Sequence, residues 1–144
     1  MPEHSKNKLE RFVGLIAPTL GEYGFTFQND ENAISSGGEF ANGFFVSDKY
    51  KIGVVFRGNR LGAIIYETDY SNIHHDGLFE GLDRSGENRL KYDSANFKAF
   101  TVDGTELHQA FINDFEDVIH PYLSNTPIED INKLIKKQRK KMGL

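Results

Sequence analysis

The chain has 144 residues, of which 38% are hydrophobic and 26% charged, and it contains no cysteine. These values are typical of one ordinary globular domain, and they exclude disulfide staples, cysteine-ligated zinc and thiol catalysis. The longest apolar run, Leu61–Tyr66, is too short to span a bilayer. We expect a single domain over residues 1–144, located in a bacterial-type cytoplasm without a signal peptide.

The net charge of −4 is unevenly distributed along the chain. Residues 133–144 carry no acid and six basic side chains: Lys133, Lys136, Lys137, Arg139, Lys140 and Lys141. Residues 1–132 therefore hold 11 basic and 21 acidic side chains, a net charge of −10. The acidic body favours a basic partner. The cationic end could instead bind an anion, such as the phosphates of a nucleic acid.

The first predicted element is an amphipathic helix that starts near Ser5. Its apolar residues recur at three- and four-residue spacing: Leu9, Phe12, Val13, Ile16, Leu20 and Tyr23. Ser5 is expected to cap this helix, because a serine hydroxyl accepts a hydrogen bond from the free N–H groups of a first turn. Pro18 has no N–H, so we expect a kink or an early end there.

Four strands are predicted next. Phe25–Gln28 alternates like a short strand, and Glu39–Asp69 is typical of three strands joined by two tight turns. The first turn, at Asp48-Lys49, would pair Phe45 with Ile52 and Phe44 with Gly53. The second, at Gly58-Asn59, suits a two-residue hairpin, because both residues adopt positive φ readily.

The second hairpin defines two unequal faces. One face is an apolar ladder that should meet the core, with the pairs Phe56/Leu61, Val54/Ala63 and Ile52/Ile65. The other face carries Lys51, Arg57, Arg60, Tyr66 and Phe44. It is covered by a helix or left as a contact surface, and in the second case Arg57, Arg60 and Tyr66 are candidate binding residues.

Helices are predicted after Asp69. A short one begins at Ser71 or Asn72, whereas residues 83–101 lack a clean period and either hide a strand or form a functional loop. A capping box, Asp103 to Glu106, starts a longer helix whose last turn Pro121 perturbs. Its apolar stripe is Leu107, Phe111, Phe115, Val118 and Tyr122, widened by Ile112 and Ile119. Thr126-Pro127 opens a final helix with Ile128, Ile131, Ile135, Gln138 and Met142 on one side.

The element order favours an α+β fold, in which an antiparallel meander of about four strands follows an N-terminal helix and precedes about three helices packed on the sheet. This layout is similar to that of small bacterial accessory proteins, including toxin-neutralising immunity proteins. The similarity is one of layout alone, so it transfers no residue roles.

The densest titratable cluster is His74-His75-Asp76. Adjacent helical residues point about 100° apart, so the two histidines cannot chelate one ion without further ligands such as His108, His120 or Glu116. No metal-binding spacing supports such a set, and we expect no metal and no cofactor. His120 is instead predicted to form a charge pair within its helix, since it lies four residues after Glu116 and three after Asp117.

Other catalytic patterns fail on inspection. Gly81–Gly86 has the glycine spacing of a phosphate loop, but Glu87 stands where that loop needs lysine. A histidine–aspartate dyad could be drawn with Ser71, Ser85 or Ser94, yet no strand–turn–helix elbow frames any of these serines. Paired carboxylates, such as Glu67 with Asp69, arise easily among 21 acids.

Three functions remain as hypotheses. The first is a non-enzymatic module that binds another protein, with its acidic body suited to a basic partner. The second is a small enzyme or ligand-binding domain that uses His74, His75, Asp76 and Tyr66 in a pocket beside residues 83–101. The third is nucleic-acid binding through the basic tail, which the acidic body and the lack of interleaved aromatic residues disfavour.

Overall fold

The computed structural model describes residues 4–29, 40–68, 71–93, 99–102, 106–141 and 143. The first half contains helix α1 (His4–Glu22) and strands β1 (Thr26–Asn29), β2 (Phe40–Val46), β3 (Lys51–Arg57), β4 (Arg60–Glu67) and β5 (Asn72–His74). The second half contains α2 (His75–Gly81), β6 (Lys91–Asp93), β7 (Ala99–Thr101), α3 (Leu107–Asp114), the π-helical segment η2 (Phe115–Ile119), α4 (His120–Asn125) and α5 (Ile128–Lys141).

The strands form an antiparallel five-stranded sheet in the order β1-β2-β3-β4-β5, and β6 pairs with β7 in a separate hairpin. The predicted α+β class is confirmed. The predicted count of about four strands is too low, because residues 72–74 pair with β4 instead of starting a helix, with His74 opposite Ile65. Residues 83–101, the segment without a clear period, contain both β6 and β7.

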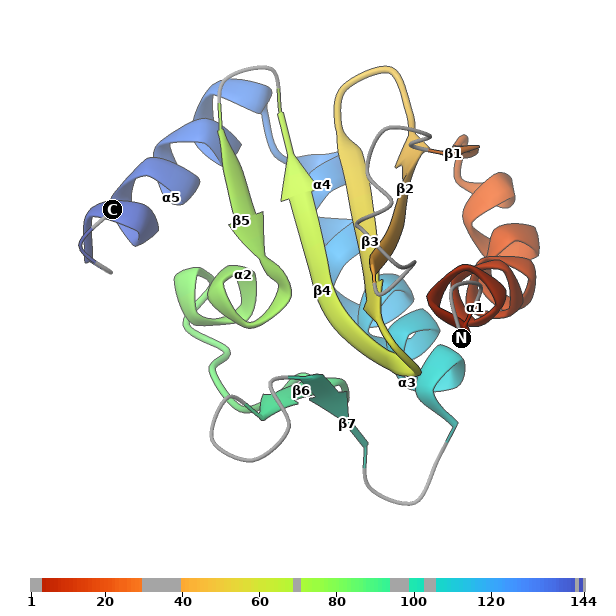
Figure 1. The fold of residues 1–144 in the computed structure, drawn as a ribbon. Coiled ribbons are helices and arrows are strands. Elements are labelled where there is room, and N and C mark those ends of the chain that lie inside the picture. The colour runs from red at the N-terminus through yellow and green to blue at the C-terminus, as the bar shows by residue number, and fades with distance from the viewer. Residues whose placement is uncertain are drawn as a thin grey trace.

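Helices pack on one face of the sheet (Figure 1). The continuous helix made by α3, η2 and α4 crosses behind the strands, and α1 lies at the side of β2 and β3 and contacts both. The short helix α2 and the terminal helix α5 contact each other beside β5. No described helix lies in front of β2, β3 or β4 in this view. Within the described part of the chain, no helix has the length and apolar character that a membrane crossing requires.

The register between β2 and β3 is the predicted one, with Phe45 opposite Ile52 and Phe44 opposite Gly53. The ring of Phe44 packs over Gly53, 3.6 Å from the position that a Cβ atom would occupy. A closer approach, which the sequence did not reveal, occurs at Gly43. A Cβ atom there would collide with the ring of Phe27 and lie 2.9 Å from the backbone oxygen of Gln28, so β1 can pair with β2 only because this residue is glycine.

The predicted register between β3 and β4 is wrong beyond the hairpin tip. Gly58 has a φ of 63°, as the tip requires, and Phe56 pairs with Leu61. A β-bulge then inserts one extra residue, so that Val54 faces Ile64 and Ile52 faces Tyr66. Because side chains alternate between the faces of a strand, this single residue exchanges the two sides of β4.

The exchange changes which residues of β4 enter the core. Ile64 and Tyr66 are buried at 0% and 3% exposure, whereas Ala63 and Ile65, which the ladder placed in the core, are half-buried on the opposite face. The opposite, outer face of the sheet therefore carries Phe44, Val55, Ala63 and Ile65 as well as the expected basic residues, and Tyr66 has left it.

The expected cap at Ser5 and the expected early end at Pro18 are both wrong. Ser5 lies inside the helix, fully buried, and its hydroxyl accepts a hydrogen bond of 2.8 Å from the N–H of Gly58 at the hairpin tip. The helix also passes Pro18 without ending and continues to Glu22. The predicted apolar side is confirmed in the core through Leu9, Phe12, Ile16 and Leu20.

The predicted long helix is confirmed, with Phe111, Phe115, Val118, Ile112 and Ile119 buried. The start of its capping box, Asp103, lies outside the described residues. The predicted place of Glu106 in that box is wrong, because Glu106 precedes the first helical residue, Leu107, and makes no side-chain capping hydrogen bond. The perturbation expected from Pro121 takes the form of the π-helical turn η2, in which the N–H of His120 bonds to the oxygen of Phe115. The final helix begins at Ile128 as expected and buries Ile131, Ile135 and Gln138; Met142 lies outside the described residues.

Candidate functional site

The two neighbouring histidines of the predicted cluster lie in different environments. His74 is the last residue of β5 and is exposed. His75 is the first residue of α2 and is completely buried, in ring contact with Phe79 and Phe111. The change from strand to helix between them turns one side chain outward and the other into the core. The cluster therefore cannot act as one unit on a single ligand.

His75 is the centre of a buried polar network. Its Nε2 atom lies 2.9 Å from Oδ2 of Asp114, and its Nδ1 atom lies 2.7 Å from the hydroxyl of Tyr66. A carboxylate only accepts hydrogen bonds, so the proton of a neutral imidazole sits on Nε2 and Nδ1 accepts from Tyr66. Burial, with the negative charges of Asp114 and Asp76, holds the pKa of Tyr66 well above 10.0. The tyrosine therefore remains a neutral donor.

Asp114 joins this network to the loop before β6. Its Oδ1 accepts from the N–H of Arg89 at 2.7 Å, and its Oδ2 accepts from the N–H of Leu90 at 3.0 Å as well as from His75. Tyr66, His75 and Asp114 have exposures of 3%, 0% and 1%. No substrate atom can reach a set so enclosed, so the network fixes the positions of β4, α2, α3 and the loop.

Sequence reasoning missed Asp114, although a signal for it exists. The residue lies three positions after Phe111 and four before Val118, on the same apolar stripe of the long helix. A carboxylate on a buried stripe needs donors brought to it by other elements. Its partner His75 is 39 residues earlier in the chain, and no spacing rule connects two such distant residues.

A cavity opens beside this network, where β4, β5, α2 and the β6–β7 hairpin meet. Its volume is about 320 Å³, and its lining residues are Gly62, His74, Asp76, Gly77, Glu80, Tyr92 and Phe100. Phe100 is 7% exposed and supplies an apolar wall, and Tyr92 contacts it edge to face at 5.4 Å between ring centroids. The extra residue of the β-bulge region, Gly62, contributes no side chain, which leaves space on the β4 side.

Two carboxylates of α2 face this cavity. Asp76 is half-buried, and its oxygens accept hydrogen bonds from the Asn88 side chain at 2.8 Å and from the Tyr92 N–H at 3.2 Å. Burial is the main cause that raises the pKa of Asp76, and these two hydrogen bonds act against it. Glu80 lies one turn later, with Lys141 3.5 Å away from its Oε1 atom. The cavity thus combines aromatic walls with negative charge.

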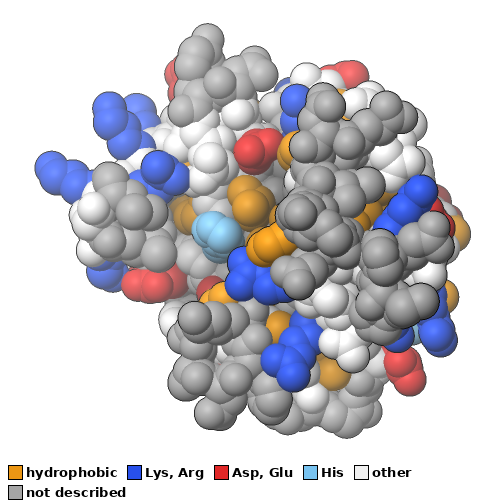
Figure 2. Space-filling view, in the orientation of Figure 1, with side chains coloured by type: hydrophobic (Ala, Val, Ile, Leu, Met, Phe, Trp, Pro, Cys, Tyr) orange, Lys and Arg blue, Asp and Glu red, His pale blue; other side chains and the backbone are white. Residues whose placement is uncertain are grey.

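The remaining predicted binding residues lie elsewhere on the outer face of the sheet. The guanidinium of Arg57 lies 4.6 Å from the ring centroid of Phe40, and the ammonium of Lys51 lies 5.7 Å from that of Phe44. Arg60 is exposed opposite Arg57 at the hairpin tip. Figure 2 looks onto this face and shows separate hydrophobic patches with basic side chains, an acidic side chain and a histidine beside them.

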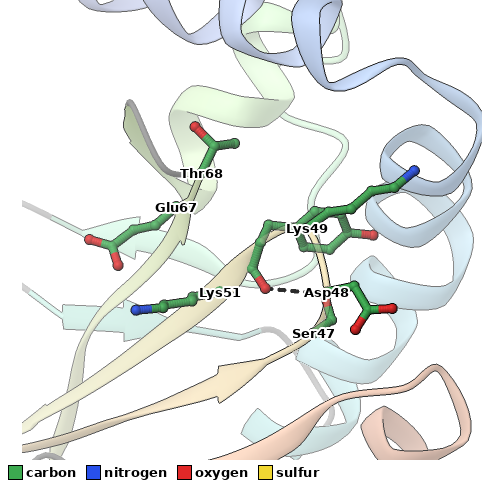
Figure 3. A pocket seen from close by; sticks show the side chains of 7 residues that line it. Ser47, Asp48, Lys49, Lys51, Glu67 and Thr68 are labelled. Carbon is green, nitrogen blue, oxygen red and sulfur yellow. Dashed lines mark hydrogen bonds between the residues drawn. The ribbon is translucent and has the colours of Figure 1, made fainter.

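A second, more polar cavity of about 260 Å³ lies at the β2–β3 turn, where Ser47–Lys51 face Glu67 and Thr68 (Figure 3). The Ser47 hydroxyl donates to the Tyr50 carbonyl oxygen at 3.1 Å. Lys51 and Glu67 extend to one side of the cavity, whereas Lys49 and Asp48 point to the other. Its charged groups do not converge on one point, so this cavity is the weaker candidate.

The basic tail is part of a packed helix. Arg139 donates to the side-chain oxygen of Asn72 at 3.0 Å and thereby ties α5 to β5. The buried residues Ile135 and Gln138 alternate with the exposed Lys133, Lys136, Lys137 and Lys140. These lysines point to solvent from a helix whose other side is committed to the fold.

The predicted charge pair of His120 with Glu116 or Asp117 is not formed. The ring of His120 packs on that of Tyr23 at 4.2 Å between centroids, and Tyr23 donates its hydroxyl to Glu116 at 3.0 Å. The ion pairs among the described residues do not include one of His120. In the same part of the chain, no group of three histidine or acidic side chains is arranged to hold a metal ion.

No protein-family model, curated protein or solved structure matches this chain.

Proposed function

We propose that this protein is a non-enzymatic module, accessory or inhibitor-like in its role, that binds another protein through the outer face of its sheet. The observation that carries the proposal is that β2, β3 and β4 present half-buried apolar side chains on the side away from the described helices, among them Phe44, Val55 and Ile65. Contiguous apolar surface rimmed by charge is typical of protein–protein contact sites.

The cations on this face support binding. Lys51 and Arg57 each lie over a phenyl ring, an arrangement that holds a flexible side chain in a defined position before any partner arrives. Less conformational entropy is then lost on association. The enzyme alternative has weaker support, because His75 and Tyr66 are enclosed in the core and only His74 and Asp76 of that predicted set line a cavity.

The overall charge supports a partner that is basic as a whole, while Lys51, Arg57 and Arg60 on the docking face itself would meet acidic groups of that partner. Residues 1–132 carry a net charge of −10, which attracts cationic proteins over distances comparable to the Debye length, about 8 Å at physiological ionic strength. We place the module in the cytoplasm, because that compartment is reducing and a chain without cysteine does not depend on disulfides for its stability. Nucleic-acid binding through the lysines of α5 has less support, since the remainder of the chain repels a polyanion.

Position-specific photo-cross-linking in the source cell tests this proposal. A photoreactive amino acid at Val55 is expected to give a discrete adduct with one partner, whereas the same amino acid at Leu15 gives none. Leu15 is a matched control because it is apolar and 44% exposed on α1. Association of the identified partner should slow as salt rises from low to physiological ionic strength. An adduct from Leu15 alone, no adduct at all, or binding insensitive to salt would overturn the proposal.

A further inference from the structure

The cavity beside β5 has the size of a site for one side chain. Its volume of about 320 Å³ stands at the lower end of the range of about 300–1,000 Å³ that small-molecule sites occupy. The cavity lies at the β5 edge of the outer face, with His74 exposed at its margin. A protein docked on that face could therefore insert a single residue here.

The lining selects the charge of the inserted group. Tyr92 and Phe100 offer aromatic rings, which attract cations electrostatically, and the carboxylates of Asp76 and Glu80 supply negative charge. Lys141 is not among the lining residues, but its ammonium lies 3.5 Å from Glu80, so this carboxylate already accepts one ammonium partner. An anionic group would be repelled by the same two carboxylates, and a purely apolar group would leave Asp76 partly desolvated without a counter-charge.

The lining also discriminates between kinds of cation. Each oxygen of Asp76 already accepts one hydrogen bond, from Asn88 or from Tyr92, so one lone pair remains on each oxygen, and a guanidinium fork would need both of these at once. An ammonium group acts as a compact point charge and needs only one further lone pair. Its alkyl stem can lie along Phe100 and beside Gly62, which has no side chain on the β4 side of the cavity.

We propose that this cavity receives the side chain of a lysine from the partner protein. This inference rests on the proposed function as a protein-binding module, and it names the residue type that would anchor the partner. Bound ammonium would compensate the burial of the Asp76 carboxylate, so the pKa of Asp76 should fall when the site is filled.

Nuclear magnetic resonance titration with short capped peptides tests this anchor without the partner. The peptide acetyl-Gly-Lys-Gly-amide is expected to shift the resonances of Gly62, Gly77 and Tyr92 with millimolar affinity. The same peptide with norleucine in place of lysine removes the charge and keeps the alkyl stem, and it should shift them far less. Free n-butylammonium shares the chemistry; weaker binding by it than by the lysine peptide supports a protein source, whereas tighter binding would overturn the assignment to a partner's lysine.

Three variants and one control sharpen the test. Glu80→Gln and Asp76→Asn should each weaken the lysine peptide at least about fivefold, as expected for the loss of a charge-assisted contact. Gly62→Leu should weaken binding by narrowing the β4 side of the cavity; Gly62 is not among the glycines with positive φ, and an added Cβ atom would make ordinary contacts, at 3.7 Å from the Val55 oxygen and 3.8 Å from Cβ of Arg57. Glu87→Gln removes an equal charge outside the lining and should leave the affinity unchanged. Retained affinity in Glu80→Gln and Gly62→Leu, or equal shifts with norleucine, would overturn the inference.

Failure of this anchor is distinguishable from failure of the proposed function. Cross-linking at Val55 does not depend on the cavity. If Val55 gives its adduct and the lysine peptide does not bind, the module binds its partner without a lysine anchor. If the peptide binds but only Leu15 gives an adduct, the cavity is real and the outer face is not the docking surface.

Discussion

The Nε2 atom of His75 lies 2.9 Å from Oδ2 of Asp114, and both side chains are at most 1% exposed. This contact joins the first residue of α2 to the last residue of α3. A buried ion or hydrogen-bonded pair stabilises only while both partners and their remaining hydrogen bonds are in place. The network around His75 is therefore a position at which small chemical changes have large effects on folding.

Replacing Asp114 with alanine should lower the free energy of unfolding by about 3–5 kcal/mol, because it leaves His75 and two backbone N–H groups buried without an acceptor. Urea unfolding monitored by circular dichroism measures the change. Asp117→Ala is the matched control, since Asp117 is 59% exposed and its pairing with Arg89 should contribute about 0–1 kcal/mol. Equal losses in the two variants would mean that the buried network has no special role.

The raised pKa of Tyr66 leads us to expect that the free energy of unfolding falls at alkaline pH. Its pKa is raised in the folded state, so above pH 10 the unfolded chain releases a proton that the folded chain keeps. The unfolded state then binds fewer protons, and the free energy of unfolding falls as the pH rises further. Tyr66→Phe should be less stable at pH 7, by about 1–3 kcal/mol, because Nδ1 of His75 loses its donor.

The same variant should show a shallower decline of stability between pH 10 and pH 11 than the unmodified protein. Urea unfolding at a series of pH values gives this slope. Tyr50→Phe is the control. Burial also raises the pKa of Tyr50, but the partner of His75 is the hydroxyl of Tyr66. Parallel pH profiles for Tyr66→Phe and the unmodified protein would show that Tyr66 ionises freely in the folded state.

Gly43→Ala should lower the free energy of unfolding by about 1–3 kcal/mol, since the added methyl group meets the Gln28 backbone oxygen at 2.9 Å as well as the ring of Phe27. Gly53→Ala is the control on the neighbouring strand. Its methyl group would lie 3.6 Å from Phe44, an ordinary contact, so its stability should stay within about 1 kcal/mol of the original. Thermal unfolding of the two variants side by side tells whether the close approach of β1 to β2 is the cause.

Gln138→Met should raise the free energy of unfolding by about 1 kcal/mol. The Gln138 side chain is 5% exposed, and its Nε2 atom has no hydrogen-bond partner among the described residues. Methionine keeps the length and flexibility of the side chain and removes the unsatisfied amide. Gln138→Glu, which places a charge at the same position, should destabilise the protein. A methionine variant less stable than the original would show that the amide is satisfied in solution.

The sequence predicts well what depends on neighbouring residues. The β2–β3 register follows from a tight turn, and the stripe of the long helix follows from periodicity, so Phe45 and Phe111 were placed correctly. Which side of β4 faces the core could not be predicted. Ala63, Ile64 and Ile65 are three apolar residues in succession, so the sequence fits either side, and nothing in it indicates the bulge. Contacts between distant segments, such as His75 with Asp114, depend on how the helices are placed on the sheet.

The bulge between Leu61 and Ile64 also limits how the length of this chain can vary. Deleting one residue there would return β4 to plain alternation, move Ile65 inward and carry Tyr66 away from His75. An insertion at the solvent-exposed tip, next to Asn59, lengthens the turn and leaves the number of residues from Val55 to Arg57 and from Arg60 to Ala63 unchanged. The tip at Asn59 and the bulge at Gly62 are three residues apart and tolerate different changes. The tip can be lengthened, whereas the bulge must keep its extra residue so that Ile64 and Tyr66 still face the core.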